Sequence, residues 1–244
     1  MGDVSLTDEQ GLDAVADRRR EILVAVLTLA TAVAVIGFVF GVGAASAGAS
    51  VPQTVLMSVL VFTGASQFSA VGVVASGGGL GTALGGALLL AARNTVYGLA
   101  MSRYITGSLP KRLLAAQFTI DETTAMAAAQ TRDEDRRYAF WATALAFFVF
   151  WNVGGLIGAI LGSSIDPETY GLDVAVPAAF VAMVLPHLRH RRGLIAGTLG
   201  AAICLAFVPF TPIGVPILCA SAAILIGIPV PDRPDDLPTE PVDA

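Results

Sequence analysis

Charge is what this sequence has least of. Charged residues make up 14% of its 244 positions, about half of the share of about 25% that is usual in soluble proteins. No charged residue falls within 22–92, 138–165, 174–188 or 193–231. A helix on a soluble core needs polar and charged residues on its wet face every turn or two. Gaps of this length therefore exclude a soluble fold and place most of the chain in lipid.

Other absences exclude whole classes of function. The only two cysteines, Cys204 and Cys219, lie in apolar segments without CxxC spacing, and we interpret them as small buried hydrophobic residues. No P-loop, GxSxG or HExxH motif is present, and each of these would indicate a specific chemistry. The net charge is −5, whereas a nucleic-acid-binding protein would need a basic patch. We predict a protein that is not an enzyme and that needs no cofactor or metal.

Apolar residues are what the chain has in abundance, at 55% with a further 26 glycines. A helix that crosses a bilayer needs about 20 mainly apolar residues. The sequence therefore predicts an all-α, polytopic transmembrane helix bundle with about seven or eight spans, and it leaves room for broken or re-entrant helices among them. The clear candidates are 22–45, 53–76, 80–102, 138–161, 172–188, 193–210 and 213–230.

The remaining residues form two short ends. Residues 1–21 are a mixed acidic and basic segment, 22–230 the transmembrane domain, and 231–244 an acidic, proline-rich tail. The first twenty residues hold five acids and no apolar stretch, which argues against a cleaved signal peptide. We expect a multi-pass protein of the cytoplasmic (inner) membrane with both termini in the cytoplasm.

Basic clusters predict the topology, because arginine and lysine accumulate in short cytoplasmic loops. Three clusters occur, at 18–20, 132–137 and 189–192, and an even number of crossings must separate them if all are cytoplasmic. Only three clear spans lie between the first two clusters. Either 112–130 crosses as a fourth span, which we favour, or 53–76 is re-entrant and 112–130 lies along the membrane surface. The four-span version leaves the basic residues of 103–112 outside.

Three ionisable residues fall where lipid is expected. Arg93 lies near the middle of 80–102, and a charge there costs at least ~2.5–3.5 kcal/mol on insertion scales. It therefore faces a partner, a cavity or, if the span is shifted, the interface. Asp121 and Glu122 lie within 112–130, and a deep carboxylate favours its protonated form unless a cation is near. We predict a substrate-binding role for Arg93 and proton coupling for the two acids.

Small and polar residues interrupt two of the predicted spans. Gly64, Ala65, Ser66 and Gln67 lie in the centre of 53–76, where they weaken the helix and suit either close packing or a broken helix that binds substrate. Asn152 interrupts 138–161 in the same way and suits an interhelical hydrogen bond or the substrate site. Gly37, Gly41, Gly154, Gly158 and Gly162 have the small-xxx-small spacing of helix-packing faces.

Several of these blocks together resemble the AzlC-type permease family. The blocks are Phe62-Thr63-Gly64-Ala65-Ser66-Gln67-Phe68, Ala92-Arg93-Asn94-Thr95-Val96-Tyr97-Gly98, Thr119-Ile120-Asp121-Glu122-Thr123, and Trp151 ahead of Gly154 and Gly155. They occur in the family's order over roughly 20–230. Two positions depart from the family pattern: Ala91 stands where the family has Asn, and Asn94 where it has His.

The resemblance implies the large subunit of a two-component exporter of branched-chain amino acids, driven by the proton gradient. It further implies a small hydrophobic partner subunit of the AzlD type, and it adds Asn94 and Tyr97 to the substrate-binding residues. Two other classes stay open: a structural membrane subunit without its own substrate, and an intramembrane enzyme. The direction of transport and the identity of the amino acid are not determined by residue types.

Overall fold

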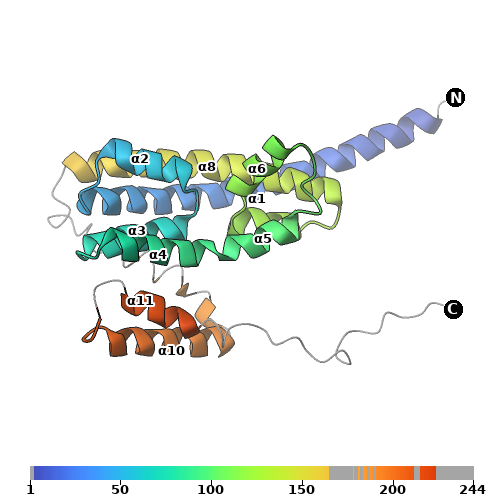
Figure 1. The fold of residues 1–244 in the computed structure, drawn as a ribbon. Helices are drawn as coiled ribbons and strands as arrows, with labels where there is room; N and C mark the ends of the chain where they lie inside the picture. Colours follow the sequence, from blue (N-terminus) through green and yellow to red (C-terminus); the bar gives the residue numbers. More distant parts are fainter. Residues whose placement is uncertain are drawn as a thin grey trace, which may run out of the picture. The chain divides into compact units, whose positions relative to one another are not determined.

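The computed structural model describes residues 3–164, 178, 181, 184–185, 187–189, 191–211 and 215–223, and it describes side chains from residue 13 on, except those of 187, 192, 217 and 222. The described residues contain helices and no strand, so the all-α prediction is confirmed for them. The chain divides into two compact units, Met1–Val181 and Ala182–Ala244. The first unit holds all of the predicted site residues and is described first (Figure 1).

Two long parallel helices, α1 (Asp3–Ser46) and α8 (Asp133–Ser164), form the centre of this unit. Both contain segments that are long and apolar enough to cross a bilayer, Asp13–Ser46 and Asp133–Ser164. Their backbones approach closely at glycines: a Cβ on Gly37 would lie 2.6 Å from the carbonyl oxygen of Trp151, and one on Gly158 would overlap that of Phe38. The predicted packing role of these glycines is confirmed.

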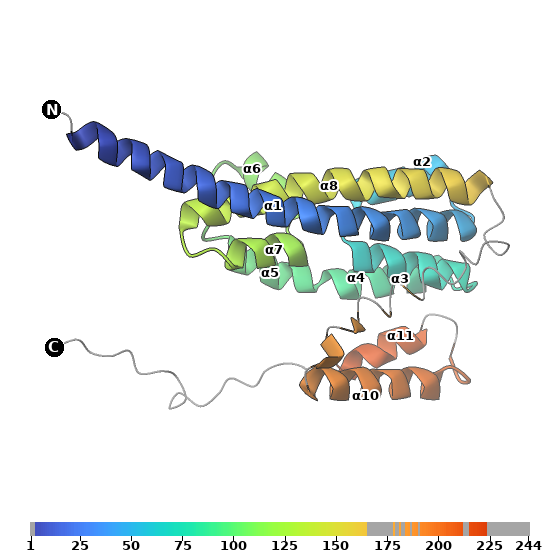
Figure 2. The same ribbon diagram turned by 180° about the vertical axis from the view of Figure 1, so that it is seen from behind.

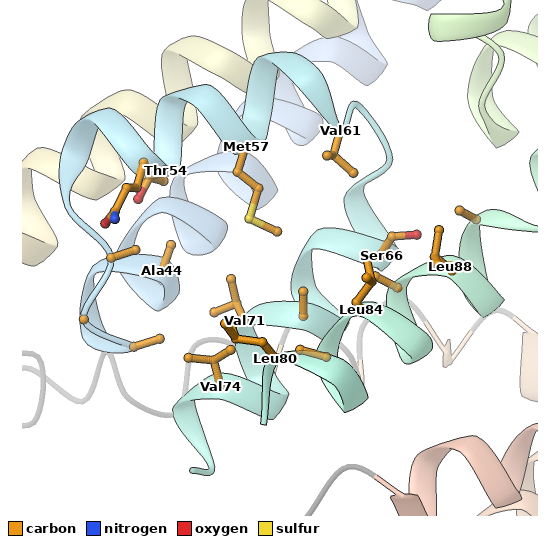
Figure 3. A pocket seen from close by; sticks show the side chains of 18 residues that line it. Ala44, Thr54, Met57, Val61, Ser66, Val71, Val74, Leu80, Leu84 and Leu88 are labelled. Carbon is orange, nitrogen blue, oxygen red and sulfur yellow. The ribbon is translucent and has the colours of Figure 1, made fainter. Parts of the chain in front are cut away.

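The predicted span 53–76 is a helical hairpin. Helix α2 (Val51–Leu60) begins at Ser50, which forms a capping box with Gln53, and α3 begins at Gly64 and ends at Ala75. Figure 3 shows Thr54, Met57 and Val61 following one another in one direction along α2, and Ser66, Val71 and Val74 returning in the opposite direction along α3. The chain therefore turns back at 61–63 and does not continue across.

The next two helices form one nearly continuous rod. Helix α4 (Leu80–Ala91) is followed directly by α5 (Arg93–Met101), and the residue between them, Ala92, keeps helical dihedrals of φ −56° and ψ −31°. The rod runs beside α3 and then on past it (Figures 1 and 2). It matches the predicted span 80–102 and places Arg93 at its centre.

A second hairpin follows, made of α6 (Leu109–Gln117) and α7 (Asp121–Ala128). Ala115 of α6 and Ala127 of α7 share one apolar cluster with Met101 and Phe140, so the two legs lie at the same level on either side of the turn at 118–120. The first hairpin enters at the end of the unit where α1 ends, and the second enters at the opposite end (Figures 1 and 2). The turns of the two hairpins meet in the middle.

This arrangement of the helices contains two hairpins, whereas each topology that the sequence left open contained at most one. Three rods run the length of the unit, namely α1, α4–α5 and α8, and two hairpins turn back half way. The segment 53–76 turns back on itself, as a re-entrant segment would, and 112–130 turns back as well. Whether each crosses the membrane stays a prediction. A crossing and a hairpin contain the same number of apolar residues, so the hydropathy pattern does not distinguish them. The total of seven or eight spans stays a prediction.

All basic loops of the unit gather at one end, which we call the basic end. Arg18 of α1 pairs with Asp135 of α8 at 3.0 Å, and Arg19 lies over the ring of Tyr138. Arg136 donates to the hydroxyl of Tyr104, in the α5–α6 loop. At the other end, the described connections 47–50 and 76–79 carry no charged residue; we call it the uncharged end.

The second unit contains α10 (Arg191–Phe207), α11 (Val215–Ala220), and two 3₁₀ turns, η3 (His187–Arg189) and η4 (Ser221–Ala223). Helix α10 corresponds to the predicted span 193–210. The predicted spans 172–188 and 213–230 fall partly, and the tail 231–244 entirely, outside the described residues.

Candidate functional site at the meeting point of two hairpins

The first part of the site is the start of α3. Its cap residue, Thr63, is extended and makes no side-chain capping bond. The N–H groups of Ser66 and Gln67 reach the carbonyl of Thr63 at 3.0 and 3.2 Å, whereas those of Gly64 and Ala65 have no acceptor within the helix. A helix start of this kind carries a partial positive charge and binds anions.

Buried polar side chains without a hydrogen-bond partner surround this helix start. Ser66 is 1% exposed and Gln67 0%, and the Ser66 hydroxyl and the Gln67 carbonyl oxygen have no partner among the described residues. The amide nitrogen of Gln67 donates to the Met57 carbonyl at 3.3 Å and so joins α3 to α2. Trp151 of α8 closes the site, because a Cβ on Gly64 would lie 3.0 Å from its ring, and its indole N–H has no partner either.

An apolar cavity of about 710 Å³ opens from this point between the two legs of the first hairpin (Figure 3). Val61 and Ser66 line its inner end at the turn, and Ala44 and Val74 line its outer end. We call it the α2–α4 cavity, because α4 forms the remaining wall. The cavity places an apolar volume next to unpartnered polar groups, which is the usual composition of a small-molecule site.

The second part of the site is an ion pair. Arg93, at the junction of α4 and α5, contacts Asp121, at the start of α7, with 2.8 Å between Nη1 and Oδ2. About two-fifths of each side chain is open (41% and 38%). The charges of Arg93, Asp121 and Glu122 all act on the phenol of Tyr97. Asp121 and Glu122 lie in the first turn of α7, where the helix dipole favours negative charge.

The two hairpin turns contact each other and connect the two parts. Helix α2 ends at Leu60, so its last carbonyls have no donor within the helix. The amide nitrogen of Gln117 donates to two of them, those of Val59 and Leu60, at 3.2 and 3.0 Å. The rings of Phe62 and Phe118 meet edge to face at 5.8 Å, and each packs against Phe148 at 5.4 Å. A broken helix is tolerated at membrane depth only where protein or a cavity covers its backbone, and these contacts supply that cover.

The structure thus separates the predicted site residues into two groups. Gly64, Ala65, Ser66 and Gln67 lie at the α3 start, and Arg93, Asn94, Tyr97, Asp121 and Glu122 lie at the ion pair. Arg93 does not line the α2–α4 cavity, although Ala91, two residues earlier, does. Asn152 donates to Phe148 of its own helix at 2.8 Å. The interhelical hydrogen bond expected for Asn152 is therefore not among those seen.

Sequence reasoning missed the residues that hold the second hairpin turn. The Thr123 hydroxyl donates to the Phe118 carbonyl at 2.8 Å and accepts from the Ile120 N–H at 3.0 Å, and Gln117 joins the two turns. A signal was available: the dipeptide Phe62-Thr63 of the first turn recurs as Phe118-Thr119 in the second.

Broken helices that meet in the middle of a helix bundle are found in many membrane transporters. The model of the AzlC protein family matches residues 28–165, and the chain belongs to this family. The AzlC family is a transport-related membrane family and not an enzyme family. The predicted family and the prediction that the protein is not an enzyme are therefore confirmed.

Curated relatives agree with this assignment. The chain is 29% identical over 202 residues to the inner membrane protein YgaZ of Escherichia coli, covering 79% of each chain. It is 26% identical over 152 residues to the branched-chain amino acid transport protein AzlC of Bacillus subtilis, covering 62% of this chain and 60% of the relative. An uncharacterized membrane protein of Archaeoglobus fulgidus is 28% identical over 191 residues, covering 77% and 84%. No solved structure matches the chain.

Proposed function

We propose that this protein is the large subunit of a two-component exporter of branched-chain or other small apolar amino acids, driven by the proton gradient. The observation that carries the proposal is the start of α3. Its free N–H groups and the unpartnered Ser66 hydroxyl adjoin an apolar cavity. An amino acid with an aliphatic side chain needs an anion-binding group beside an apolar volume, and this place offers both.

In this proposal the substrate lies with its carboxylate at Gly64–Ser66 and its side chain in the α2–α4 cavity. Val61, Met57 and Leu88 would contact the aliphatic side chain, because they line the cavity wall. The Gln67 carbonyl oxygen, buried and without a partner, is the acceptor best suited to the substrate ammonium group. Each polar contact, at the α3 start, the Ser66 hydroxyl or the Gln67 carbonyl oxygen, would satisfy a group that otherwise stays buried without a partner at a cost of about 1–3 kcal/mol.

Proton coupling follows from the ion pair. While Arg93 contacts Asp121 at 2.8 Å, the nearby cation stabilises the charged carboxylate. A substrate carboxylate that approached Arg93 would compete with Asp121, and the released carboxylate would then take up a proton. Glu122 has no ion-pair partner among those seen and is the second candidate to carry the proton. Substrate movement and proton movement would thus be linked through Arg93.

The basic end gives the orientation we propose, with both termini in the cytoplasm. Apart from Arg93, every basic residue of 18–137 belongs to that end, including those of 103–112. The re-entrant hairpins therefore remove the conflict with the positive-inside rule that a fourth crossing would create. The protein would lie in the cytoplasmic membrane with the α2–α4 cavity toward the outside.

A small hydrophobic membrane subunit of the AzlD type completes the proposal. Apolar residues of α4 and α5 that do not line the α2–α4 cavity are exposed in the single chain, namely Leu89, Val96 and Leu99 at 43–77%. The Arg93–Asp121 pair is also partly open, and an open ion pair at mid-depth calls for cover by protein or water.

The deciding experiment is transport of labelled leucine, isoleucine, valine and methionine into inside-out vesicles, with and without the partner subunit and with an imposed proton gradient. Accumulation that depends on the gradient supports the proposal. The variant Ser66→Ala, which removes one unpartnered hydroxyl, should raise KM without loss of protein. Vesicles that hold both subunits at normal abundance but move none of the four amino acids would favour a structural subunit instead.

A further inference from the structure

A second cavity, of about 350 Å³, lies between α5 and α6 on the other side of the hairpin turns. We call it the α5–α6 cavity. Thr119, in the second turn, lines its inner limit, and Arg112 and Leu109 line it nearer the basic end. None of the residues assigned to the substrate or to the proton above belongs to this cavity.

The α5–α6 cavity has the position in the second hairpin that the α2–α4 cavity has in the first. Ala49, Gln53 and Met57 line the α2–α4 cavity, and Ile105, Leu109 and Leu113 line the α5–α6 cavity. The spacing along the chain from Ala49 to Ile105 is the same as that from Gln53 to Leu109 and from Met57 to Leu113. It also equals the spacing from Phe62 to Phe118 in the two turns.

The two turns correspond by the same spacing. Thr63 corresponds to Thr119, and Gln67 corresponds to Thr123. Gln67 and Thr123 are both 0% exposed. Each donates a hydrogen bond to a carbonyl earlier in its own hairpin, Gln67 to Met57 in α2 and Thr123 to Phe118 in the turn. In both hairpins the second leg packs on the rod that follows it, α3 on α4 and α7 on α8. The hairpins enter from opposite ends (Figures 1 and 2), which is the arrangement expected of an inverted repeat.

We propose that the α5–α6 cavity is a second binding site for the same class of ligand, an α-amino acid with a small apolar side chain, open to the basic end. This inference rests on the proposed function. Arg112 is the cation for the ligand carboxylate, and Met101, Ile105 and Leu113 contact the side chain. Between the two cavities stand the hairpin turns, closed by the contacts of Phe62 with Phe118 and of Gln117 with Leu60. Export then moves the amino acid from the α5–α6 cavity, past the turns, to the α2–α4 cavity.

The proposal is tested by the accessibility of single cysteines, introduced into a Cys204→Ser, Cys219→Ser background of the full complex in sealed vesicles. A membrane-impermeant thiol reagent is added to one side or the other. Ala116→Cys reports on the α5–α6 cavity and Ala87→Cys on the α2–α4 cavity. Leu145→Cys, 67% exposed on α8 and facing lipid or protein, is the unreactive control. We expect Ala116→Cys to react from the basic end only and Ala87→Cys from the uncharged end only. Saturating leucine should slow both reactions at least fivefold, whereas arginine should slow neither.

The Arg112 variants add a kinetic test. Arg112→Gln should raise the KM for leucine at the basic end roughly tenfold, the effect of losing one charge-assisted hydrogen bond, and leave the KM at the uncharged end unchanged. Arg112→Lys should restore most of the affinity.

The outcomes separate the two proposals. The second site would be overturned if leucine is transported and protects Ala87→Cys, while Ala116→Cys and a second reporter, Leu113→Cys, either do not react or are not protected. That result would leave the proposed function standing. Absence of both transport and protection at every position would overturn the proposed function, and with it the amino-acid ligand of both cavities.

Discussion

The Arg93–Asp121 ion pair allows a test that separates folding from transport. The three variants are Arg93→Gln, Asp121→Asn and the two combined. Each single variant leaves one charge without its partner at mid-depth, and insertion scales put that cost at about 2.5–3.5 kcal/mol. Because about two-fifths of each side chain is open, we take the lower end, about 2.5 kcal/mol, or a factor of roughly sixty in the folding equilibrium.

The two single variants should not be equal. Asp121→Asn leaves a guanidinium that stays charged under all relevant conditions. Arg93→Gln leaves a carboxylate that becomes neutral by taking up a proton, so that its cost is smaller. The double variant has no unpaired charge and should recover most of the stability. The unfolding midpoint in lipid–detergent micelles should therefore fall in the order wild type, double variant, Arg93→Gln, Asp121→Asn.

Transport should follow a different order. Arg93→Gln and the double variant should both abolish leucine transport, because neither has the cation that competes for the substrate carboxylate. Asp121→Asn should retain exchange of substrate but lose accumulation driven by the proton gradient, and Glu122→Gln should be milder. A double variant no more stable than the single ones would refute the ion-pair reasoning. Full transport by the double variant would show that the pair is structural only.

Three further predictions concern the fold. Ser108→Cys and Glu134→Cys should both react with impermeant reagents from the cytoplasmic side, and external labelling of Ser108→Cys would restore the four-crossing topology. Gly158→Ala should lower the free energy of unfolding by about 1–3 kcal/mol, because its Cβ would press α1 and α8 apart; Gly81→Ala, with open space around it, is the control, and equal midpoints would contradict close helix packing. Gln117→Leu should cost about 1–3 kcal/mol through the carbonyls it leaves without a donor, as measured by the same unfolding assay, and an unchanged midpoint would show that the turns do not depend on it.

Much of the candidate site was recognisable from residue types alone. Gly64–Gln67 and Arg93 were identifiable because small, polar or charged groups in long apolar segments are costly in lipid unless protein or water surrounds them. The glycine faces of α1 and α8 were identifiable because close backbone approach in membranes requires residues without a large side chain. These predictions rest on local chemistry, which does not depend on the path of the chain.

The path of the chain, by contrast, was decided only by tertiary contacts. Apolar length measures how much of a segment lies in lipid and carries no information on whether it continues or turns back. At 61–63 the direction is set by contacts from distant residues, the Gln117 amide at the end of α2 and the ring of Phe118 against Phe62. The sequence likewise did not determine the partner of Arg93, because Asp121 comes within 2.8 Å of it only when 112–130 turns back. The sequence by itself therefore determined that the chain is a membrane helix bundle with broken elements, and the tertiary structure decided that both breaks are hairpin turns meeting from opposite ends.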